Sequence, residues 1–161
     1  MENLLSEACC FSGHREIPAA ERESLPRLLD EYVENMYRRG ICQFICGGAV
    51  GFDALAARAV LRAREQCCDI RLTLTIPYRG VEKHRSEADR LEFEDILSQA
   101  DSVHYIAQAY SRDCMLRRNR YMVDRSRVCI CYMTETTGGT VYTVGYALKN
   151  GLEIINLAME M

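Results

Sequence analysis

Short apolar runs alternate with amphipathic stretches along the chain. Six runs have the length of buried strands, at residues 8–11, 42–46, 70–76, 103–106, 128–133 and 152–157. In the first stretch between them, apolar residues recur at spacings of three and four, and Gly40 follows at the expected helix end. The residues of this stripe are Leu25, Leu28, Leu29, Tyr32, Val33 and Met36. The same spacing predicts helices over residues 53–65, 86–100, 113–126 and 140–150.

The regular alternation of strand and helix predicts the fold class. Right-handed crossovers between parallel strands place helices on both faces of a sheet. We therefore expect an α/β, Rossmann-like fold with a mostly parallel sheet of about six strands flanked by helices on both faces. The sequence shows no repeat, linker or low-complexity stretch, so residues 1–161 are expected to form a single domain.

Composition narrows the class of protein. The chain has 161 residues, 48% hydrophobic and 27% charged, which is ordinary for a compact globular domain. No apolar run approaches the roughly 18 residues that a membrane span needs. The first ten residues contain two acids and no basic residue, unlike a secretory signal. We expect a cytoplasmic protein with no membrane partner.

Nine cysteines raise the question of disulfides or metal. The number is odd, there is no C-x-x-C, and most of the cysteines lie in or beside apolar runs. Cys129 and Cys131 share a strand face, but no second pair completes a set of four ligands. We expect small buried hydrophobic residues in a reducing compartment, and no metal site.

Three loops after predicted strands contain glycine in patterns that favour an anion. They are Ser12-Gly13-His14-Arg15, Gly47-Gly48-Ala49-Val50-Gly51-Phe52-Asp53 and Thr136-Thr137-Gly138-Gly139-Thr140. In a parallel sheet, all three emerge at the carboxyl edge of the strands. Glycine lets a phosphate approach the backbone, and a following helix supplies free N–H groups. We therefore expect a phosphate site at this edge.

Two readings of the second loop remain open. Gly47, Gly48 and Gly51 serve either a ligand or a tight turn with close packing of helix on strand. The spacing is neither the dinucleotide-binding G-x-G-x-x-G nor a P-loop, which argues against ATP hydrolysis by the P-loop route. Asp53 either accepts hydrogen bonds from sugar hydroxyls or stabilises the first helical turn.

The helix predicted at 113–126 has a polar residue in its apolar stripe. Asn119 lies on the same face as Met115, Met122 and Ser126, with Arg118 at the edge of that face. A buried asparagine needs hydrogen-bond partners, so Asn119 either fixes neighbouring backbone or faces a cavity that holds a ligand. We favour the cavity. Residues 112–127 also carry six arginines against two acids.

Together these segments resemble a known family. "FSGHR", "GGAVGFD", "CMLRRNRYMVDRS" and "GGTVYTVGYALKNGLEI", in this order, resemble the YpsA-like branch of the SLOG superfamily, which also includes the LOG (lysine-decarboxylase-like) proteins and the DNA-processing protein DprA. The resemblance implies a domain that binds a nucleotide or nucleotide-derived molecule, ADP-ribose-like, NAD-like or a nucleoside phosphate, as a sensor without a required cofactor. The implied ligand residues are Ser12, Gly13, Arg15, Gly47, Gly48, Gly51, Asp53, Arg118, Asn119, Gly138, Gly139 and Thr140.

The sequence departs from its relatives at two places. His84 follows Glu82-Lys83 where this branch often has tryptophan, which removes a stacking contact. The LOG enzymes have a glutamate in the turn after their glycines, and this chain has Val141-Tyr142-Thr143 there. A phosphoribohydrolase-like, nucleotide-processing hydrolase therefore stays an alternative, with Asp53, His14 and Glu135 as candidates for proton transfer.

Partners other than a small molecule receive less support. DprA-like binding of single-stranded DNA is a second alternative, motivated by the arginine-rich helix. A net charge of −3, 8% aromatic residues and no tryptophan leave few stacking platforms, so a nucleic-acid partner is not expected. A second copy of the chain is a further candidate partner, through exposed aromatic positions such as Tyr32 and Tyr37.

Overall fold

The predicted strands pair in a parallel sheet. A computed structural model describes residues 7–161, and within them six strands form one sheet in the order β4-β3-β2-β1-β5-β6 with every pairing parallel. The strands are β1 (Ala8–Gly13), β2 (Gln43–Cys46), β3 (Arg71–Tyr78), β4 (Ser102–Ala107), β5 (Ser126–Tyr132) and β6 (Glu153–Asn156). The expected sheet is confirmed.

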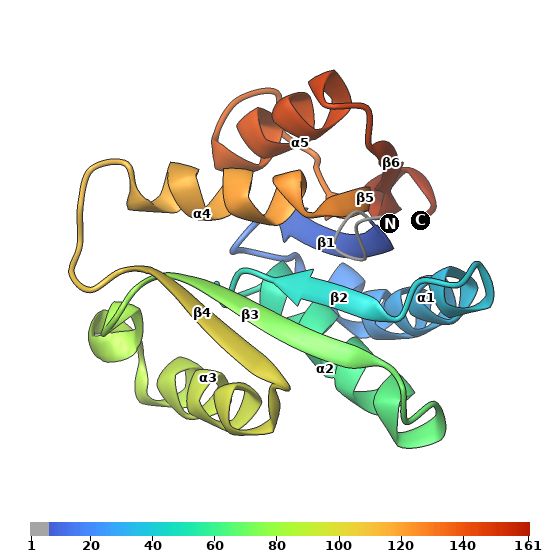
Figure 1. The fold of residues 1–161 in the computed structure, drawn as a ribbon, viewed down its shortest axis with the longest axis horizontal. Coiled ribbons are helices and arrows are strands. Elements are labelled where there is room, and N and C mark those ends of the chain that lie inside the picture. The colour runs from blue at the N-terminus through green and yellow to red at the C-terminus, as the bar shows by residue number, and fades with distance from the viewer. Residues whose placement is uncertain (1–6) are drawn as a thin grey trace, which may run out of the picture.

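Helices cover both faces of this sheet, as the alternation predicted. The α-helices are α1 (Ala19–Arg38), α2 (Phe52–Gln66), α3 (Glu87–Gln99), α4 (Cys114–Asp124) and α5 (Gly139–Lys149), and the 3₁₀ helices are η2 (Val81–His84) and η3 (Leu157–Met159). Figure 1 shows α1, α2 and α3 below the sheet and α4 and α5 above it. The fold is therefore Rossmann-like, with two unequal helical layers.

The strand order reverses at the middle of the sheet. The chain moves outward from β1 to β4, then crosses back through α4 so that β5 pairs with the free side of β1. Ligands of open α/β sheets bind outside the carboxyl ends of the strands at such a reversal. These ends lie on the left in Figure 1. The topology thus places the candidate site between the loops that follow β1, β2 and β5.

The predicted apolar stripe of α1 faces the core. Leu25, Leu29, Val33 and Met36 are buried in the same cluster as Phe44 of β2. The other two residues of the predicted stripe, Leu28 and Tyr32, are partly buried and pack against that cluster. Burying a side chain of this size contributes about 1.5–3 kcal/mol. Helix α1 begins at Ala19, before Leu25, the first residue of the stripe.

Cysteines fill much of the opposite core. Cys10, Cys129 and Cys131 pack with residues of α4 and α5, among them Val123 and Ala147. All nine cysteines are free; six are buried, Cys42 and Cys67 are half-buried, and Cys68 is exposed. The small thiols suit a layer where two helices lie close to the sheet.

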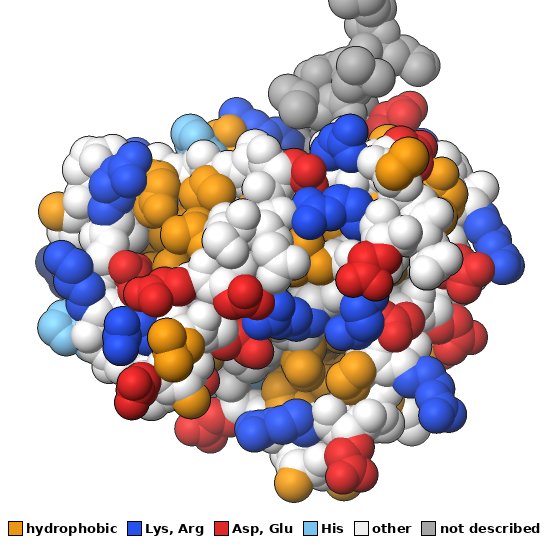
Figure 2. All heavy atoms as spheres, turned by 90° about the horizontal axis from the view of Figure 1, so that it is seen from below, with side chains coloured by type: hydrophobic (Ala, Val, Ile, Leu, Met, Phe, Trp, Pro, Cys, Tyr) orange, Lys and Arg blue, Asp and Glu red, His pale blue; other side chains and the backbone are white. Residues whose placement is uncertain are grey.

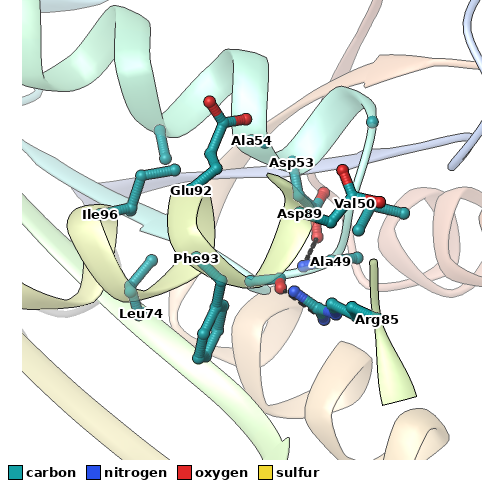
Figure 3. A pocket seen from close by; sticks show the side chains of 13 residues that line it. Ala49, Val50, Asp53, Ala54, Leu74, Arg85, Asp89, Glu92, Phe93 and Ile96 are labelled. Carbon is teal, nitrogen blue, oxygen red and sulfur yellow. Dashed lines mark hydrogen bonds between the residues drawn. The ribbon is translucent and has the colours of Figure 1, made fainter. Parts of the chain in front are cut away.

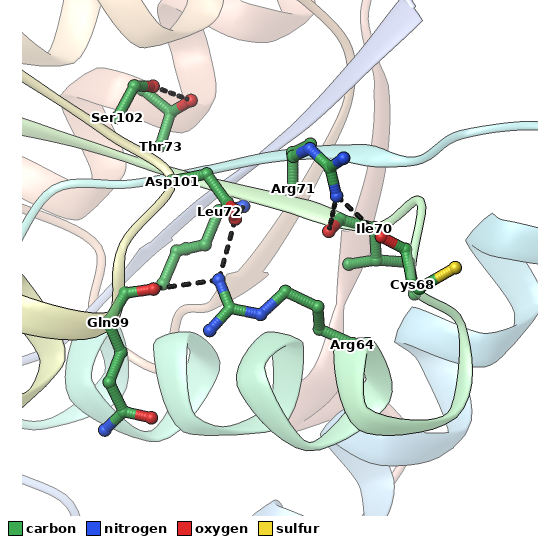
Figure 4. Close-up of polar contacts among 9 residues, drawn as sticks. All are labelled: Arg64, Cys68, Ile70, Arg71, Leu72, Thr73, Gln99, Asp101 and Ser102. Carbon is green, nitrogen blue, oxygen red and sulfur yellow. Dashed lines mark hydrogen bonds and ion pairs between the residues drawn. The ribbon is translucent and has the colours of Figure 1, made fainter.

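Asp101 stabilises the sheet at the amino ends of β3 and β4, opposite the candidate site. Its Oδ2 accepts hydrogen bonds from the backbone N–H of Leu72 and from Arg64 Nη1, both at 2.8 Å (Figure 4). Arg64 Nη1 also donates to the carbonyl oxygen of Gln99 at 2.8 Å. Burial raises the pKa of Asp101, but the Leu72 amide and Arg64 outweigh it and hold the pKa below its usual value.

Charges of both signs cover the outer side of the α1–α3 layer, which Figure 2 shows from below. Arg58 pairs with Asp95 at 2.6 Å, and Arg62 pairs with Asp30 at 2.8 Å. The arginines of this face are therefore interspersed with acids rather than gathered into one basic patch.

Among the helices of residues 7–161, none combines the length and apolar character that crossing a membrane requires.

Two sequence expectations about local detail are wrong. Tyr32 and Tyr37 are half-buried rather than exposed, since Tyr32 packs on the core and Tyr37 Oη donates to Asp69 Oδ1 at 2.7 Å. β1 also runs two residues beyond its apolar run. Its Ser12 and Gly13 continue the ladder with β5, so the first ligand loop is partly strand.

Candidate functional site

A pocket opens at the carboxyl edge where the strand order reverses. It has a volume of about 360 Å³, and we call it the α5 lobe because the first turn of α5 forms one wall. Its lining includes nine of the residues expected to bind ligand: Ser12, Gly13, Arg15, Asp53, Arg118, Asn119, Gly138, Gly139 and Thr140. Residues from four separate segments of the sequence therefore meet at one place.

The loops after β1 and β2 are locked together by backbone contact. The N–H of Phe52 donates to the carbonyl oxygen of His14 at 3.1 Å. A Cβ atom on Gly51 would overlap the carbonyl oxygen of Arg15, and Gly51 has φ of +77°. A Cβ atom on Gly13 would strike the ring of Phe52. These two glycines are required by the packing of protein on protein.

Two further glycines are explained in the same way. A Cβ atom on Gly48 would lie 2.5 Å from Ile76 Cδ1, and Gly48 has φ of +73°. A Cβ atom on Gly47 would lie 2.7 Å from Arg118 Nη1 and 2.9 Å from Asp53 Oδ2. The sequence left open whether the glycines of the second loop serve a ligand or close packing, and close packing accounts for them.

The glycines at the start of α5 face open space instead. No protein atom lies within 4 Å of a Cβ built on Gly138 or Gly139. The first intrahelical bond runs from Tyr142 N–H to the Gly138 carbonyl oxygen at 3.1 Å, which leaves the amides of the preceding turn free of that ladder. Here a phosphate can approach the backbone without displacing protein.

Arg118 is the most unusual side chain of the site. It is only 7% exposed, yet it lines the α5 lobe. Its Nη1 donates to the carbonyl oxygen of Gly47, and its Nε donates to Asn119 Oδ1 at 2.7 Å. Asn119 lines the cavity, as the sequence suggested, but it is half-buried, and Arg118 is the more deeply buried of the two.

Asp53 supplies the opposite charge. It is 6% exposed, and its Oδ2 accepts a hydrogen bond from the N–H of Ala49 at 3.2 Å. Burial raises the pKa of Asp53, although Arg118, the Ala49 amide, Arg15 and Arg85 all oppose the rise. Burial likewise lowers the pKa of Arg118, and Asp53 opposes that change. Each buried charge is therefore tolerated because of the other.

His14 and Glu135 differ in their relation to the pocket. His14 lines it, and its Nε2 accepts a hydrogen bond from the N–H of Thr134 at 2.9 Å. This bond requires an Nε2 without a proton, so the neutral ring carries its proton on Nδ1. Glu135 is exposed and is not part of the lining. Of the three proton-transfer candidates, Asp53 and His14 reach the site.

Arg85 is a site residue that the sequence did not single out. It follows η2, and its Nη2 donates to the carbonyl oxygen of Gly48 at 2.9 Å while its guanidinium lies 4.9 Å from the centre of the Phe93 ring. Figure 3 shows Ala49 between the Asp53 carboxyl and Arg85. Burial and Arg15 lower the pKa of Arg85. The available signal was its position after β3, at the same edge of the sheet.

The cleft drawn in Figure 3 is too small to hold a nucleotide. Gly48 and Gly51 line it together with Phe93 and Ile96, but its volume is about 30 Å³. That is room for about one water molecule. Gly48 and Gly51 thus face this small cleft and do not line the α5 lobe.

A second, larger pocket lies on the other side of Arg118. It has a volume of about 440 Å³, and we call it the β3 lobe because Tyr78, His84 and Arg85 from the segment after β3 line it. Gly47 lines this lobe, and Arg15 and Arg118 line both lobes.

Within residues 7–161, no group of three or more His, Cys, Asp or Glu side chains could hold a metal ion.

Comparison with protein families identifies the chain's relatives. The YpsA model, described as the YspA SLOG family, matches residues 16–157. The chain belongs to this SLOG family. A UPF0398 protein of Halalkalibacterium halodurans is 26% identical over 128 residues, which is 78% of this chain and 68% of the relative. A UPF0398 protein of Bacillus cereus is 29% identical over 133 residues, covering 81% of this chain and 70% of the relative.

Solved structures with a similar fold include two DNA processing proteins A (DprA). Those of Streptococcus pneumoniae and Helicobacter pylori each match 94% of this SLOG chain with a TM-score of 0.66 and 18% identity. The chain spans 50% of the first protein and 66% of the second. The Helicobacter pylori structure concerns a single-stranded DNA binding mode, so the comparison lends no support to the expectation that nucleic acid is not a partner.

Proposed function

We propose that this protein binds a nucleotide or a nucleotide-derived molecule through its phosphate groups. One observation carries the proposal: the open first turn of α5 faces the nine-tenths-buried Arg118 across the α5 lobe. Helix N-terminal amides and an arginine fork are both well suited to phosphate oxygens. Asp53 lies in the same lobe, where its carboxylate can accept hydrogen bonds from sugar hydroxyls.

Isothermal titration calorimetry with ADP-ribose, NAD, AMP and cyclic dinucleotides tests this function. We expect at least one of them to bind, and Arg118→Gln to weaken its binding by about tenfold or more. Arg117→Gln is the matched control, because Arg117 is the exposed neighbour on the same helix. Failure of the folded wild-type protein to bind every member of this panel would count against the proposal.

The buried carboxyl of Asp53 favours one second candidate, a nucleotide-processing hydrolase. Burial raises the pKa of Asp53, which is how enzymes prepare a carboxyl for proton transfer. Incubation with NAD and nucleoside monophosphates, followed by chromatography, should then release free base, and Asp53→Asn should abolish the release. No turnover at high protein concentration would leave ligand binding as the function.

Single-stranded DNA is the remaining alternative, because a fold neighbour is described with such a binding mode. A gel shift at low salt with a single-stranded oligonucleotide addresses it directly. Binding that persists when the α5 lobe is altered by Arg118→Gln would place the DNA elsewhere on the surface.

A further inference from the structure

The two lobes described above share part of their lining, and the shared part carries positive charge. Arg15, Arg118, Ala49 and Met115 line both lobes, so these four residues stand where the lobes meet. Arg118 Nη1 and Nε already donate to Gly47 and Asn119, which leaves Arg118 Nη2 and the exposed Arg15 to a ligand at the junction. A single phosphate at the start of α5 would occupy only the outer part of this arrangement.

Each lobe also has apolar surface suited to a ring or a sugar. Phe11 and Met122 line the α5 lobe. Tyr78 and Val81 line the β3 lobe, where Tyr78 is held edge-to-face against Tyr110 with ring centres 5.6 Å apart. Volumes of about 360 and 440 Å³ give the two lobes similar room. Each lobe is therefore large enough to hold its own part of a ligand.

Positively charged side chains outnumber negatively charged ones around the junction. Three arginines, Arg15, Arg85 and Arg118, meet two carboxylates, Asp53 and Asp89, across the two lobes. Asp53 and Arg118 offset one another in the buried floor, as their opposed effects show. Of the two lobes, Asp89 and Arg85 line the β3 lobe alone, so Arg15 is the charge at the junction that no carboxylate offsets. Bridging anionic groups placed there would meet Arg15 beside Arg118 and lie within reach of both apolar ends.

We infer that the ligand is a diphosphate-bridged nucleotide, with its diphosphate at Arg15 and Arg118 and one organic end in each lobe. This deepens the proposed function and rests on it. In this arrangement Tyr78 and His84 contact the end that a mononucleotide lacks. The β3 lobe thus decides between mononucleotides and longer molecules of the ADP-ribose type.

Titration of AMP, ADP and ADP-ribose into the wild-type protein and into two β3-lobe variants tests the inference. ADP-ribose is expected to bind about tenfold more tightly than AMP, and Tyr78→Ala and His84→Ala to remove that advantage while leaving AMP affinity unchanged. His104→Ala is the matched control, since His104 is an exposed histidine of β4 outside both lobes. Circular dichroism establishes that every variant is folded.

The possible outcomes separate the two proposals. Equal affinities for AMP and ADP-ribose, unchanged in Tyr78→Ala and His84→Ala, would overturn the two-lobe ligand and leave phosphate binding intact. Loss of AMP binding in Tyr78→Ala would also overturn it, because the inference places Tyr78 at the end of the ligand that AMP lacks. No binding of any of the three compounds, with NAD and cyclic dinucleotides also silent, would remove the proposed function itself.

Discussion

Arg118 and Gly47 join α4 to the loop after β2 through a hydrogen bond from the guanidinium to the Gly47 carbonyl oxygen. The contact depends on the missing side chain of Gly47, since a Cβ atom there would lie 2.7 Å from Arg118 Nη1. The same atom would lie 2.9 Å from Asp53 Oδ2. One glycine therefore maintains the spacing of both buried charges.

Gly47→Ala is expected to displace Arg118 and to weaken both folding and ligand binding. Overpacking of a closed site of this kind costs about 1–3 kcal/mol. Gly139→Ala is the control, because a Cβ there meets no protein atom within 4 Å, and it should change stability by less than about 0.5 kcal/mol. Urea denaturation measures both. Equal stabilities of the two variants would show that the Gly47 contact is relaxed in solution.

Gly51→Ala and Gly145→Ala should change stability in opposite directions. Gly51 has positive φ and no room beside the Arg15 carbonyl, so alanine is expected to lower the free energy of unfolding by about 2 kcal/mol or more. Gly145 lies inside α5 with open space around it, and alanine should raise that free energy by about 0.5–1 kcal/mol. Thermal and urea unfolding report the sign directly, and a gain in Gly51→Ala would contradict the packing described for the two loops.

The buried charges of Asp53 and Arg118 should be energetically coupled. Arg118→Met leaves Asp53 without its main opposing charge, and Asp53→Asn does the same to Arg118. In a double-mutant cycle, the double variant is expected to recover about 1–3 kcal/mol of the summed single losses. Strict additivity of the two substitutions in urea denaturation would show that these groups do not interact.

Asp101 is expected to make stability depend on acid pH. Its pKa is lowered in the folded chain, so the unfolded chain takes up the proton first as pH falls. Solvent screens this exposed carboxylate, so its contribution is about 0.5–1 kcal/mol at neutral pH. It is fully present above the unfolded pKa of about 3.9 and is lost as pH falls through the lower folded value. The difference between wild type and Asp101→Asn should therefore shrink below about pH 4.

A second carboxylate provides the control for that pH series. Asp95 forms an exposed ion pair with Arg58, and pairs of this kind contribute little. Asp95→Asn is expected to change stability by less than about 0.5 kcal/mol at any pH. A neutral-pH loss in Asp95→Asn equal to that in Asp101→Asn would argue that the Leu72 amide bond is unimportant.

Much of the fold could be predicted because burial imposes a regular pattern on the sequence. Four residues of the predicted α1 stripe, Leu25, Leu29, Val33 and Met36, are buried, and the strands fall on the apolar runs. The end of β1 could not be predicted, since Ser12 and Gly13 are polar or small. They become strand only because β5 lies beside them.

The sequence predicted which loops meet at the candidate site, but it did not predict how deeply the side chains of the site are buried. The rule that parallel strands end at one edge places His14, Asp53 and Gly138 together, and the structure does so. The burial of Arg118 depends on how α4 crosses the sheet, which helical spacing does not encode. Arg85 carries no local motif, and it reaches the second loop only through the path of the chain after β3.

The rigid contact between the first two loops divides the site into parts with different freedom to evolve. Substitutions at Gly13 or Gly51 disturb main-chain packing before they touch any ligand. At Gly139 a Cβ atom would meet no such neighbour, whereas Gly80 and Gly138 require glycine because of their own positive φ. Side chains such as Tyr78, His84 and Thr140 can therefore diverge in evolution without disturbing the main-chain contact that holds the first two loops together.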